Sequence, residues 1–360
     1  MPDSLRLGQV GLGWFGGIHL QTWTGIEGVQ IVGVCDRDPA RFEKSRDRSA
    51  QDEFHVEGAG APPVELPSGT LATTDLDELI DAGIDLLDVV VSEEAHAGCV
   101  RRGLEAGVDV IVEKPVALSF PEAESLVRLA ADVGRNLYVG HIMRFDPRAM
   151  TVAALIEGHQ LKHMSMQRNF QRVAHDVYGR THPVHNAAIH DLDLALWYAG
   201  RPPERVSAFE SRFLGRETPD VLDIILHWED GLRAVIQNSW HLPAGCPYGF
   251  EFECKVQTSG DSIVVRNQPD VEVWSSSSSH SPELFFWPYF DHSRRGSLRS
   301  ELEHFATRAR SRLPSDRVPV HQVLWLMKVA DAVLEALAAD DGRLIPLAET
   351  QAWNGRRTRS

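Results

Sequence analysis

Short apolar runs recur along roughly the first 140 residues and alternate with amphipathic stretches. The runs are rich in Val, Ile and Leu, which is typical of strands buried on both faces of a parallel sheet. They occupy residues 5–10, 29–35, 86–91, 108–112 and 136–140. Because helical patterns separate these runs, the sequence predicts βαβ units and a doubly wound α/β domain.

Two of the intervening helices carry start signals. Ser119 opens the sequence Ser-Phe-Pro-Glu, which has the pattern of a capping box with proline in the first turn, and Gly134 follows as a stop. Asp75 precedes a second, shorter helical pattern by the same logic. These signals support the alternation of strands and helices.

A different pattern follows residue 150. Successive strand-like segments alternate apolar and polar residues, without helices between them, and turn residues such as Asp230-Gly231 punctuate them. Such a series indicates antiparallel pairing. The segments are 205–213, 221–228, 232–240, 250–258, 261–266 and 271–274, and helical patterns occupy 151–158, 185–200, 298–312 and 319–338.

These patterns predict two domains in the 360-residue chain. We expect an α/β domain over residues 1–142 and an α+β domain with a mostly antiparallel sheet over residues 143–360. The second domain would bind the substrate and carry the contacts of an oligomer.

Composition narrows the classes of function. Hydrophobic residues make up 43% of the chain and charged residues 24%, which suits a soluble globular protein. The 36 Lys and Arg against 51 Asp and Glu give a net charge of −15, which disfavours a nucleic-acid surface. Charges or turn residues interrupt every apolar run too early for a membrane span, and the N-terminus lacks a secretory pattern. Because the four cysteines lack metal-type spacing and are too sparse for a disulfide scaffold, we expect a cytoplasmic protein.

A glycine-rich turn follows the first strand-like run. Gly11, Gly13 and Gly16 have the GxGxxG spacing that lets a backbone bend tightly and approach a pyrophosphate at a helix N-terminus. Asp36 ends the next strand 20 residues after Gly16, where a carboxylate bonds ribose hydroxyls. Strand, turn, helix and acid together predict a dinucleotide site.

The choice between the two nicotinamide dinucleotides rests on neighbouring residues. The Asp36 carboxylate repels a 2′-phosphate and favours NAD, whereas Arg37 beside it is able to receive that phosphate and favours NADP. We expect NAD or NADP, with a slight preference for NAD.

Glu113-Lys114-Pro115 closes the fifth strand-like run, at the edge where open α/β sheets bind ligands. Proline disfavours a helical conformation for Lys114 and holds it extended. In a dry cleft such a lysine loses its proton more easily or donates to a substrate oxygen. Composition alone also allows an ordinary surface lysine.

Four segments together resemble the Gfo/Idh/MocA family of oxidoreductases. They are VGLGWFG, CDRDP, AHAGCVRRGLEAGVDVIVEKPVAL and GHIMRFDP. The resemblance implies a Rossmann domain followed by a domain with an open antiparallel sheet that often mediates oligomers. It also implies hydride transfer between NAD(P) and a hydroxyl or carbonyl carbon of a sugar, inositol or related polyol.

The resemblance also assigns residues. It gives Lys114 a catalytic or substrate-orienting role, places His96 near the cofactor and matches Arg144 to an arginine after the sixth strand. Ser92-Glu93 stands where the family usually has Thr-Pro. The expected cofactor-binding residues are Gly11, Gly13, Trp14, Phe15, Gly16, Asp36, Arg37, Ser92, His96, Glu113 and Lys114.

The family's second catalytic landmark is Asp-x-x-x-His with an acid three residues later. His190 and Asp193 match it, but Asn186 replaces the aspartate. Spacing i and i+4 predicts that residues 186 and 190 share one helix face. Because a neutral asparagine does not stabilise an imidazolium, either His190 is a weaker base or Lys114 transfers the proton, with His185 or Tyr178 as possible substitutes.

Several histidines lie close together around this landmark, but their spacing is irregular and no cysteine joins them. We therefore expect no metal, and polar residues lining a cleft instead. The residues concerned are His175, Asp176, His182, His185 and His190.

The sequence thus predicts an NAD(P)-dependent dehydrogenase or reductase acting on CH–OH groups, with Lys114 and His190 catalytic. Asn186, Asp193 and Arg144 would orient the substrate. Two alternatives stay open: a glycoside-processing enzyme that keeps its NAD bound, and an inactive cofactor-sensing regulatory or binding protein. We expect a polyol-like substrate, no nucleic-acid or membrane partner, and a homodimer or homotetramer formed through the C-terminal sheet.

Overall fold

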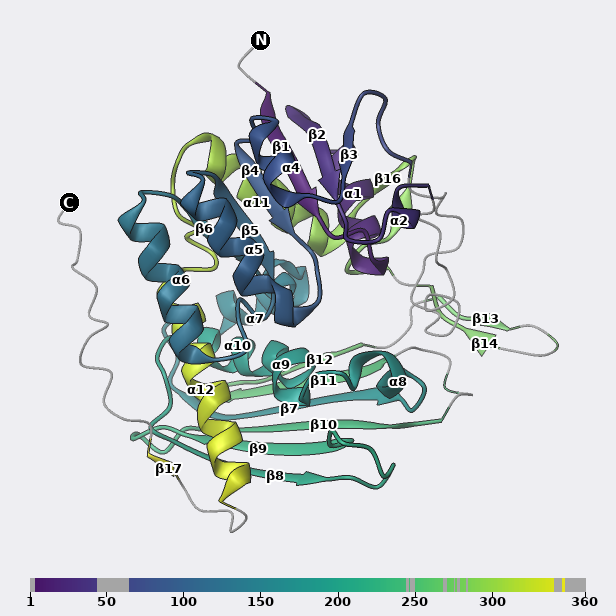
Figure 1. Cartoon of the computed structure of the whole chain (residues 1–360). Helices are drawn as coiled ribbons and strands as arrows, with labels where there is room; N and C mark the ends of the chain where they lie inside the picture. The colour runs from purple at the N-terminus through teal and green to yellow at the C-terminus, as the bar shows by residue number, and fades with distance from the viewer. Residues whose placement is uncertain are drawn as a thin grey trace.

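The computed structural model describes residues 4–43, 65–243, 246, 250–267, 271–274, 276, 279–282, 284–339 and 345–346. Its first sheet has the strand order β3-β2-β1-β4-β5-β6, and every neighbouring pair is parallel (Figure 1). The strands are β1 (Leu5–Val10), β2 (Val29–Cys35), β3 (Leu71–Thr73), β4 (Leu86–Val89), β5 (Asp109–Glu113) and β6 (Leu137–Gly140). The predicted doubly wound fold is confirmed, and its strand order changes direction between β1 and β4, where such sheets bind ligands.

Helices connect these strands as the sequence predicts. The Ser119 hydroxyl accepts a hydrogen bond from the Glu122 backbone amide, and Asp75 caps its helix by accepting from the Asp77 amide at 2.9 Å. The helices are α1 (Trp14–Thr24), α2 (Ala40–Glu43), α4 (Leu76–Asp81), α5 (Glu93–Glu105), α6 (Phe120–Asp132), η1 (Ile142–Phe145, a 3₁₀ helix) and α7 (Pro147–Leu155).

The second sheet has the order β12-β11-β7-β10-β9-β8-β17. All of its neighbouring pairs are antiparallel except β10 and β7, so the prediction of a mostly antiparallel sheet is confirmed. Its strands are β7 (Leu161–Gln171), β8 (Arg205–Ser211), β9 (Val221–His227), β10 (Arg233–Leu242), β11 (Phe250–Thr258), β12 (Ser262–Arg266) and β17 (Ile345–Pro346).

Two details of the second sheet differ from the sequence analysis. The pattern did not predict β7, although this strand lies near the middle of the sheet. The expected strand at 271–274 is only a two-residue segment of a separate ribbon, which projects from the molecule in Figure 1. The two short ribbons are β13 (Val273–Trp274) with β14 (Ser279–His280), and β15 (Tyr289–Phe290) with β16 (Ser293–Arg294).

The helix expected at 185–200 is two helices. Ala187 has φ −107° and ψ −59°, and the chain bends there between Asn186 and Ala188. The remaining helices of the described chain are α8 (Ala174–Tyr178), α9 (Pro183–Asn186), α10 (Ala188–Ala199), α11 (Gly296–Arg310) and α12 (Val320–Ala338).

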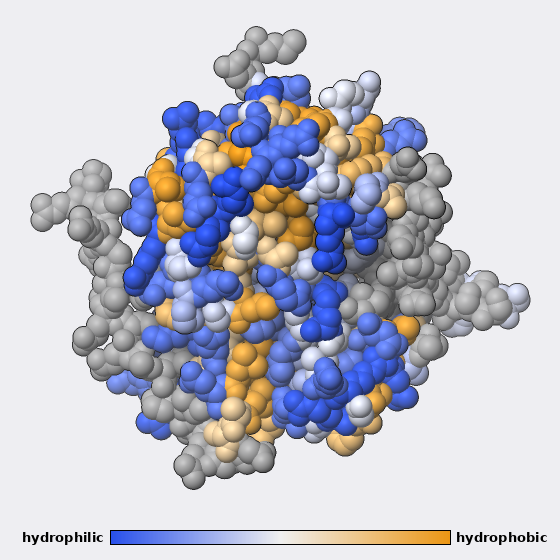
Figure 2. All heavy atoms as spheres, in the orientation of Figure 1, coloured by the Kyte–Doolittle hydropathy of each residue, from blue (hydrophilic) through white to orange (hydrophobic). Residues whose placement is uncertain are grey.

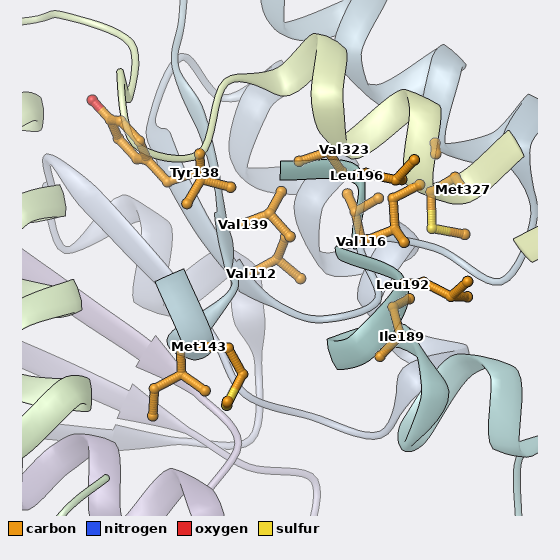
Figure 3. Packing of buried hydrophobic residues seen from close by; sticks show 14 of the residues in the cluster. Val112, Val116, Tyr138, Val139, Met143, Ile189, Leu192, Leu196, Val323 and Met327 are labelled. Atoms are coloured by element: carbon orange, nitrogen blue, oxygen red, sulfur yellow. The ribbon is translucent and has the colours of Figure 1, made fainter. Parts of the chain in front are cut away.

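One apolar core joins the two sheets. Helix α12 packs against β8, α10, β6 and α6, and α11 packs against α1 and η1. Figure 3 shows labelled members of this core from both parts of the chain: Val112, Val116, Val139, Ile189, Leu192, Leu196, Val323 and Met327. Figure 2 shows hydrophilic residues over much of the surface, with a band of hydrophobic residues down the middle of this face. The buried core therefore fixes α10 relative to the carboxyl end of β5.

Candidate active site

The glycine-rich turn is built for close backbone approach. Gly11 has φ +98°, and a Cβ atom there would lie 2.0 Å from the Val90 carbonyl oxygen. A Cβ atom on Gly16 would lie 2.2 Å from the Gly11 oxygen. Around Gly13, by contrast, the nearest atom to such a Cβ is 3.9 Å away, so space is left before the N-terminus of α1. A pyrophosphate fits this space against the backbone amides.

Asp36 lies at the end of β2 beside this turn and is largely buried. Its carboxylate accepts hydrogen bonds from the Leu12 amide at 2.7 Å and the Asp38 amide at 2.9 Å. The Arg41 guanidinium lies 3.8 Å from the same carboxylate, whereas Arg37 is exposed. The carboxylate is thus fixed at the position expected for ribose recognition.

Aromatic rings cover the start of α1. Trp14 and Phe15 are half-buried, and the ring of Trp287 packs edge-on against both, at 5.8 and 5.4 Å between centroids. Trp287 comes from the segment between β14 and β15. The cofactor turn is therefore in contact with a distant part of the chain.

The loops after β4 and β5 are joined by His96. Its Nδ1 lies 2.6 Å from the Pro115 oxygen and its Nε2 lies 3.1 Å from the Val91 oxygen. Burial lowers the pKa of His96, so the ring is neutral and donates to one carbonyl at a time. Ser92 is the N-cap residue of α5. His96 and Ser92 thus lie at the carboxyl ends of β4 and β5.

Lys114 reaches from the end of β5 to the second half of the chain. Its Nζ donates a 3.0 Å hydrogen bond to the backbone oxygen of Asn186, at the end of α9. Burial lowers the pKa of Lys114, and Arg180 and Arg168 lower it further against the opposing effect of Glu113 and Glu93. The ammonium therefore releases a proton more readily than a surface lysine does.

Asn186 does not contact His190 through its side chain as their spacing suggested. The chain bend at Ala187 puts the two residues on different helices, so the expectation of a shared helix face is wrong. The Asn186 Nδ2 instead donates to the Tyr178 oxygen at 2.7 Å and to the Thr181 oxygen at 3.1 Å. This amide ties down the segment between α8 and α9.

His190 and His185 are both neutral. The pKa of His190 falls well below 6.5 because the ring is buried, with Lys114 and Arg168 nearby. Burial and His182 lower the pKa of His185 to about 4. Lys114 and His190 are thus brought into each other's electrostatic field, as expected of two groups in one site.

Arg144 and Asp193 form a buried ion pair with each other. The guanidinium donates to both carboxylate oxygens, at 2.9 and 2.7 Å, and both side chains are at most 1% exposed. Burial raises the pKa of Asp193, but Arg144 and His141 outweigh it and lower the pKa overall. These two residues therefore fix α10 against η1.

Behind Lys114, the preceding Glu113 joins a second buried group of charges. Its Oε1 lies 3.3 Å from the His19 Nε2, and the His19 Nδ1 lies 2.9 Å from the Asp88 Oδ2. Trp23 also donates to Asp88, at 2.6 Å. Glu113 therefore faces away from the crevice toward α1.

Within the described ranges, no three His, Cys, Asp or Glu side chains are grouped as a metal site requires. His175 packs instead against Trp240, and His182 contacts Glu210 at 3.1 Å. Likewise, no helix among the described residues has the length and apolarity to cross a membrane.

Comparison with known proteins agrees with this architecture. Residues 5–141 match the family model of the oxidoreductase family with an NAD-binding Rossmann fold, and residues 161–263 match the GFO/IDH/MocA C-terminal domain. Inositol 2-dehydrogenase of Rhizobium meliloti is 24% identical over 280 residues, which cover 75% of this chain and 78% of that protein. A D-apiose dehydrogenase of Paraburkholderia graminis is 27% identical, over 64% of this chain and 59% of its own.

Solved structures share the fold. Myo-inositol 2-dehydrogenase of Lactobacillus plantarum has a TM-score of 0.77 at 20% identity, over 95% of this chain and 99% of that one. The scyllo-inositol dehydrogenase of Lactobacillus casei, solved with NAD(H) and scyllo-inositol, has a TM-score of 0.76 at 18% identity, over 96% and 100%. The chain therefore belongs to the Gfo/Idh/MocA family of oxidoreductases, whose first domain is an NAD-binding Rossmann fold.

Proposed function

We propose that the protein oxidises a hydroxyl group of an inositol, sugar or related polyol with NAD, or reduces the corresponding carbonyl. The observation that carries this proposal is the Lys114 ammonium at the carboxyl end of β5, bonded at 3.0 Å to Asn186 of the second half of the chain. The names of the inositol and apiose dehydrogenases among its relatives support the substrate class.

The glycine-rich turn would bind the dinucleotide cofactor. Gly11, Gly13 and Gly16 would hold the pyrophosphate, and Asp36 would bind the ribose hydroxyls. Trp14 and Phe15 would form one wall of the crevice, and Arg37, Ser92, His96 and Lys114 would line the rest. The Glu113 side chain points toward His19 and would support this site from behind. Bound nicotinamide accepts or supplies the hydride.

Proton transfer falls to this chain's own side chains. In oxidation, Lys114 in its neutral form takes the hydroxyl proton of the substrate, since its lowered pKa increases the neutral fraction. In reduction the ammonium returns that proton to the developing alkoxide. His190, which is neutral, accepts or donates one hydrogen bond to the same substrate.

Arg144, Asp193 and Asn186 act by orientation. The Arg144–Asp193 pair holds α10, which carries His190, and Asn186 fixes the segment before α9 while its backbone oxygen holds Lys114. Lys114 and His190 are therefore the residues that would contact the reacting atoms of the substrate.

Two broader assignments belong to the same proposal. Cys35, Cys99, Cys246 and Cys254 are all unpaired thiols, which supports a reducing, cytoplasmic location. Phe209 and Val264, on strands of the second sheet, are 52% and 40% exposed, which supports a homodimer or homotetramer formed through that sheet.

The test combines binding and turnover. Tryptophan-to-nicotinamide energy transfer during titration with NADH and NADPH measures affinity, and absorbance of the reduced nicotinamide reports turnover over a panel of inositols, sugars and polyols. We expect NADH to bind more tightly and at least one polyol to give sustained NADH release. Reduction that stops after one equivalent, with NADH retained, supports the glycoside-processing alternative. Binding without turnover supports a regulatory protein, and no binding contradicts the proposal.

A further inference from the structure

An ion pair joins the two halves of the chain beside the carboxyl end of β4. Glu93 opens α5, directly after the loop that follows β4, and is 7% exposed. Arg180 lies between α8 and α9. Its Nη2 donates to the Glu93 Oε1 at 2.9 Å and its Nε donates to the Oε2 at 3.0 Å. Such a bidentate pair fixes direction as well as distance.

The same segment is held a second time, at its other end. Asn186 terminates α9, and its backbone oxygen accepts the hydrogen bond from Lys114 at 3.0 Å. Its side-chain amide donates to the oxygen of Thr181, the neighbour of Arg180, at 3.1 Å. Residues 178–186 are therefore connected to the loop after β4 by Glu93 and to the loop after β5 by Lys114.

Charge favours this arrangement. A carboxylate in the first turn of a helix is stabilised by the N-terminal amides. Burial raises the pKa of Glu93, but its own backbone amide, Arg180 and Lys114 outweigh burial and lower the pKa overall. Glu93 is therefore ionised at neutral pH and attracts both Arg180 and Lys114.

We propose that Glu93 and Arg180 form a clasp that closes residues 178–186 over the crevice and makes both side chains positioning residues for substrate and dinucleotide. In the closed state the clasp keeps the Asn186 oxygen beside Lys114. Opening it frees one end of the segment, so that bound molecules leave faster. The effect on substrate rests on the proposed dehydrogenase function, whereas the effect on nucleotide release does not.

The test is a double-mutant cycle with Glu93→Gln, Arg180→Met and the combined variant. Stopped-flow fluorescence measures the rate of NADH release, and steady-state turnover gives the KM and kcat for the polyol. We expect each single variant to release NADH about tenfold faster and to raise KM by a similar factor, because either substitution breaks the ion pair. The kcat stays within about threefold. The combined variant is no worse than the more affected single variant, because the two side chains act through the same ion pair.

Two further variants separate positioning from folding. Arg180→Lys keeps the charge and recovers part of the loss. Arg201→Met breaks an exposed pair with Asp230, 2.6 Å long and remote from the crevice, and leaves both readouts unchanged. NADH release within twofold of the wild type in Arg180→Met, or additive effects of the two single variants, would overturn the clasp. If the wild type turns over no polyol, the proposed function fails, and NADH release still decides on the clasp.

Discussion

Two histidines near the crevice have opposite charge states. Burial disfavours the imidazolium of His19, but Asp88 and Glu113 outweigh it and raise its pKa to about 10. Around His190, burial has the same direction and Lys114 and Arg168 add to it, so the pKa falls well below 6.5. His19 is fully buried and His190 is half-buried, but burial disfavours the imidazolium in both, so the opposite outcomes come from their charged neighbours.

The comparison shows how one fold keeps a cation and a neutral base a short distance apart. Carboxylates from β4 and β5 hold a permanent charge behind the sheet, where it fixes Glu113. On the crevice side, the charged groups that act on His190 are the cations Lys114 and Arg168, so the ring stays neutral and available for hydrogen bonding to a substrate. The charged His19 thus stabilises the fold on one side of β5, and the neutral His190 is available for catalysis on the other.

The largest expected effect comes from removing the charged histidine. His19→Leu leaves Asp88 and Glu113 without their cationic partner and lowers the free energy of unfolding by about 3–5 kcal/mol, measured by urea denaturation at neutral pH. Because the pKa of His19 is raised, its stabilisation is complete below pH 6.5 and is lost as the pH rises toward about 10. The difference between variant and wild type therefore shrinks over that range.

His227→Leu, at a half-exposed histidine of β9, is the control and changes stability by about 0.5 kcal/mol or less. Equal losses in the two variants would contradict the distinction between a buried histidine that is paired with carboxylates and a half-exposed histidine that is not.

Glu301 of α11 is fully buried near the charges of His19, Asp88 and Glu113. Burial raises the pKa of its carboxyl well above 4.5, with Glu113 adding to the shift. The folded protein thus holds a proton that the unfolded chain releases, and stability falls as the pH rises above 4.5 toward the folded pKa. Glu301→Gln removes this cost, which is at most about 1.4 kcal/mol per pH unit. We expect the variant to gain more in melting temperature at pH 8 than at pH 5; an equal gain at both would contradict the raised pKa.

Asn186→Asp places a carboxylate at the end of α9, where the amide now donates hydrogen bonds to the segment between α8 and α9. The aspartate faces the Tyr178 and Thr181 carbonyls that the amide now serves, so two donated bonds are lost. We expect a loss of about 1–3 kcal/mol in the free energy of unfolding by thermal denaturation. Asn267→Asp, which loses one 3.2 Å bond to the Phe250 oxygen, costs less. An Asn186→Asp variant as stable as the wild type would contradict this role of the amide.

Asp36 gives the smallest expected effect, because several groups share the dinucleotide. Asp36→Ala weakens NADH binding by roughly tenfold, or about 1.4 kcal/mol, and reduces the preference of the protein for NADH over NADPH. Fluorescence titration with both nucleotides measures this, with Arg37→Ala as the matched variant. Unchanged NADH affinity in Asp36→Ala would show that this carboxylate does not contribute to nucleotide binding.

The parts of the fold that local signals determine were predictable from the sequence. The glycine turn, the caps at Ser119 and Asp75 and the strand that ends at Glu113 depend on short patterns, and the structure places each of them as expected. Strand β7 escaped prediction because its inward positions include Arg168, which is paired with Asp191, instead of a regular apolar series.

The long-range contacts of the site could not be predicted from local sequence patterns. No local pattern marks the bend at Ala187, and its consequence, the separation of Asn186 from His190, follows from how α9 and α10 pack. The partners Arg144 and Asp193 lie 49 residues apart, and Glu93 and Arg180 lie 87 apart. The unusual Glu93 was visible in the sequence, but its partner depends on tertiary structure.

The pH dependence of oxidation probes the crevice directly. If neutral Lys114 takes the proton, kcat rises with pH and reaches its plateau below 10.5, because the lysine's pKa is lowered. A rate that is flat between pH 6 and 10, or that still rises beyond 10.5, would assign the proton transfer elsewhere.

The most direct test of the account compares turnover and NADH affinity in Lys114→Ala. If Lys114 moves the substrate proton, polyol oxidation falls by at least about a thousandfold, within the range for a general base, while the NADH dissociation constant stays within about threefold. Retained turnover, or parallel losses of turnover and NADH binding, would contradict the central role given to this lysine.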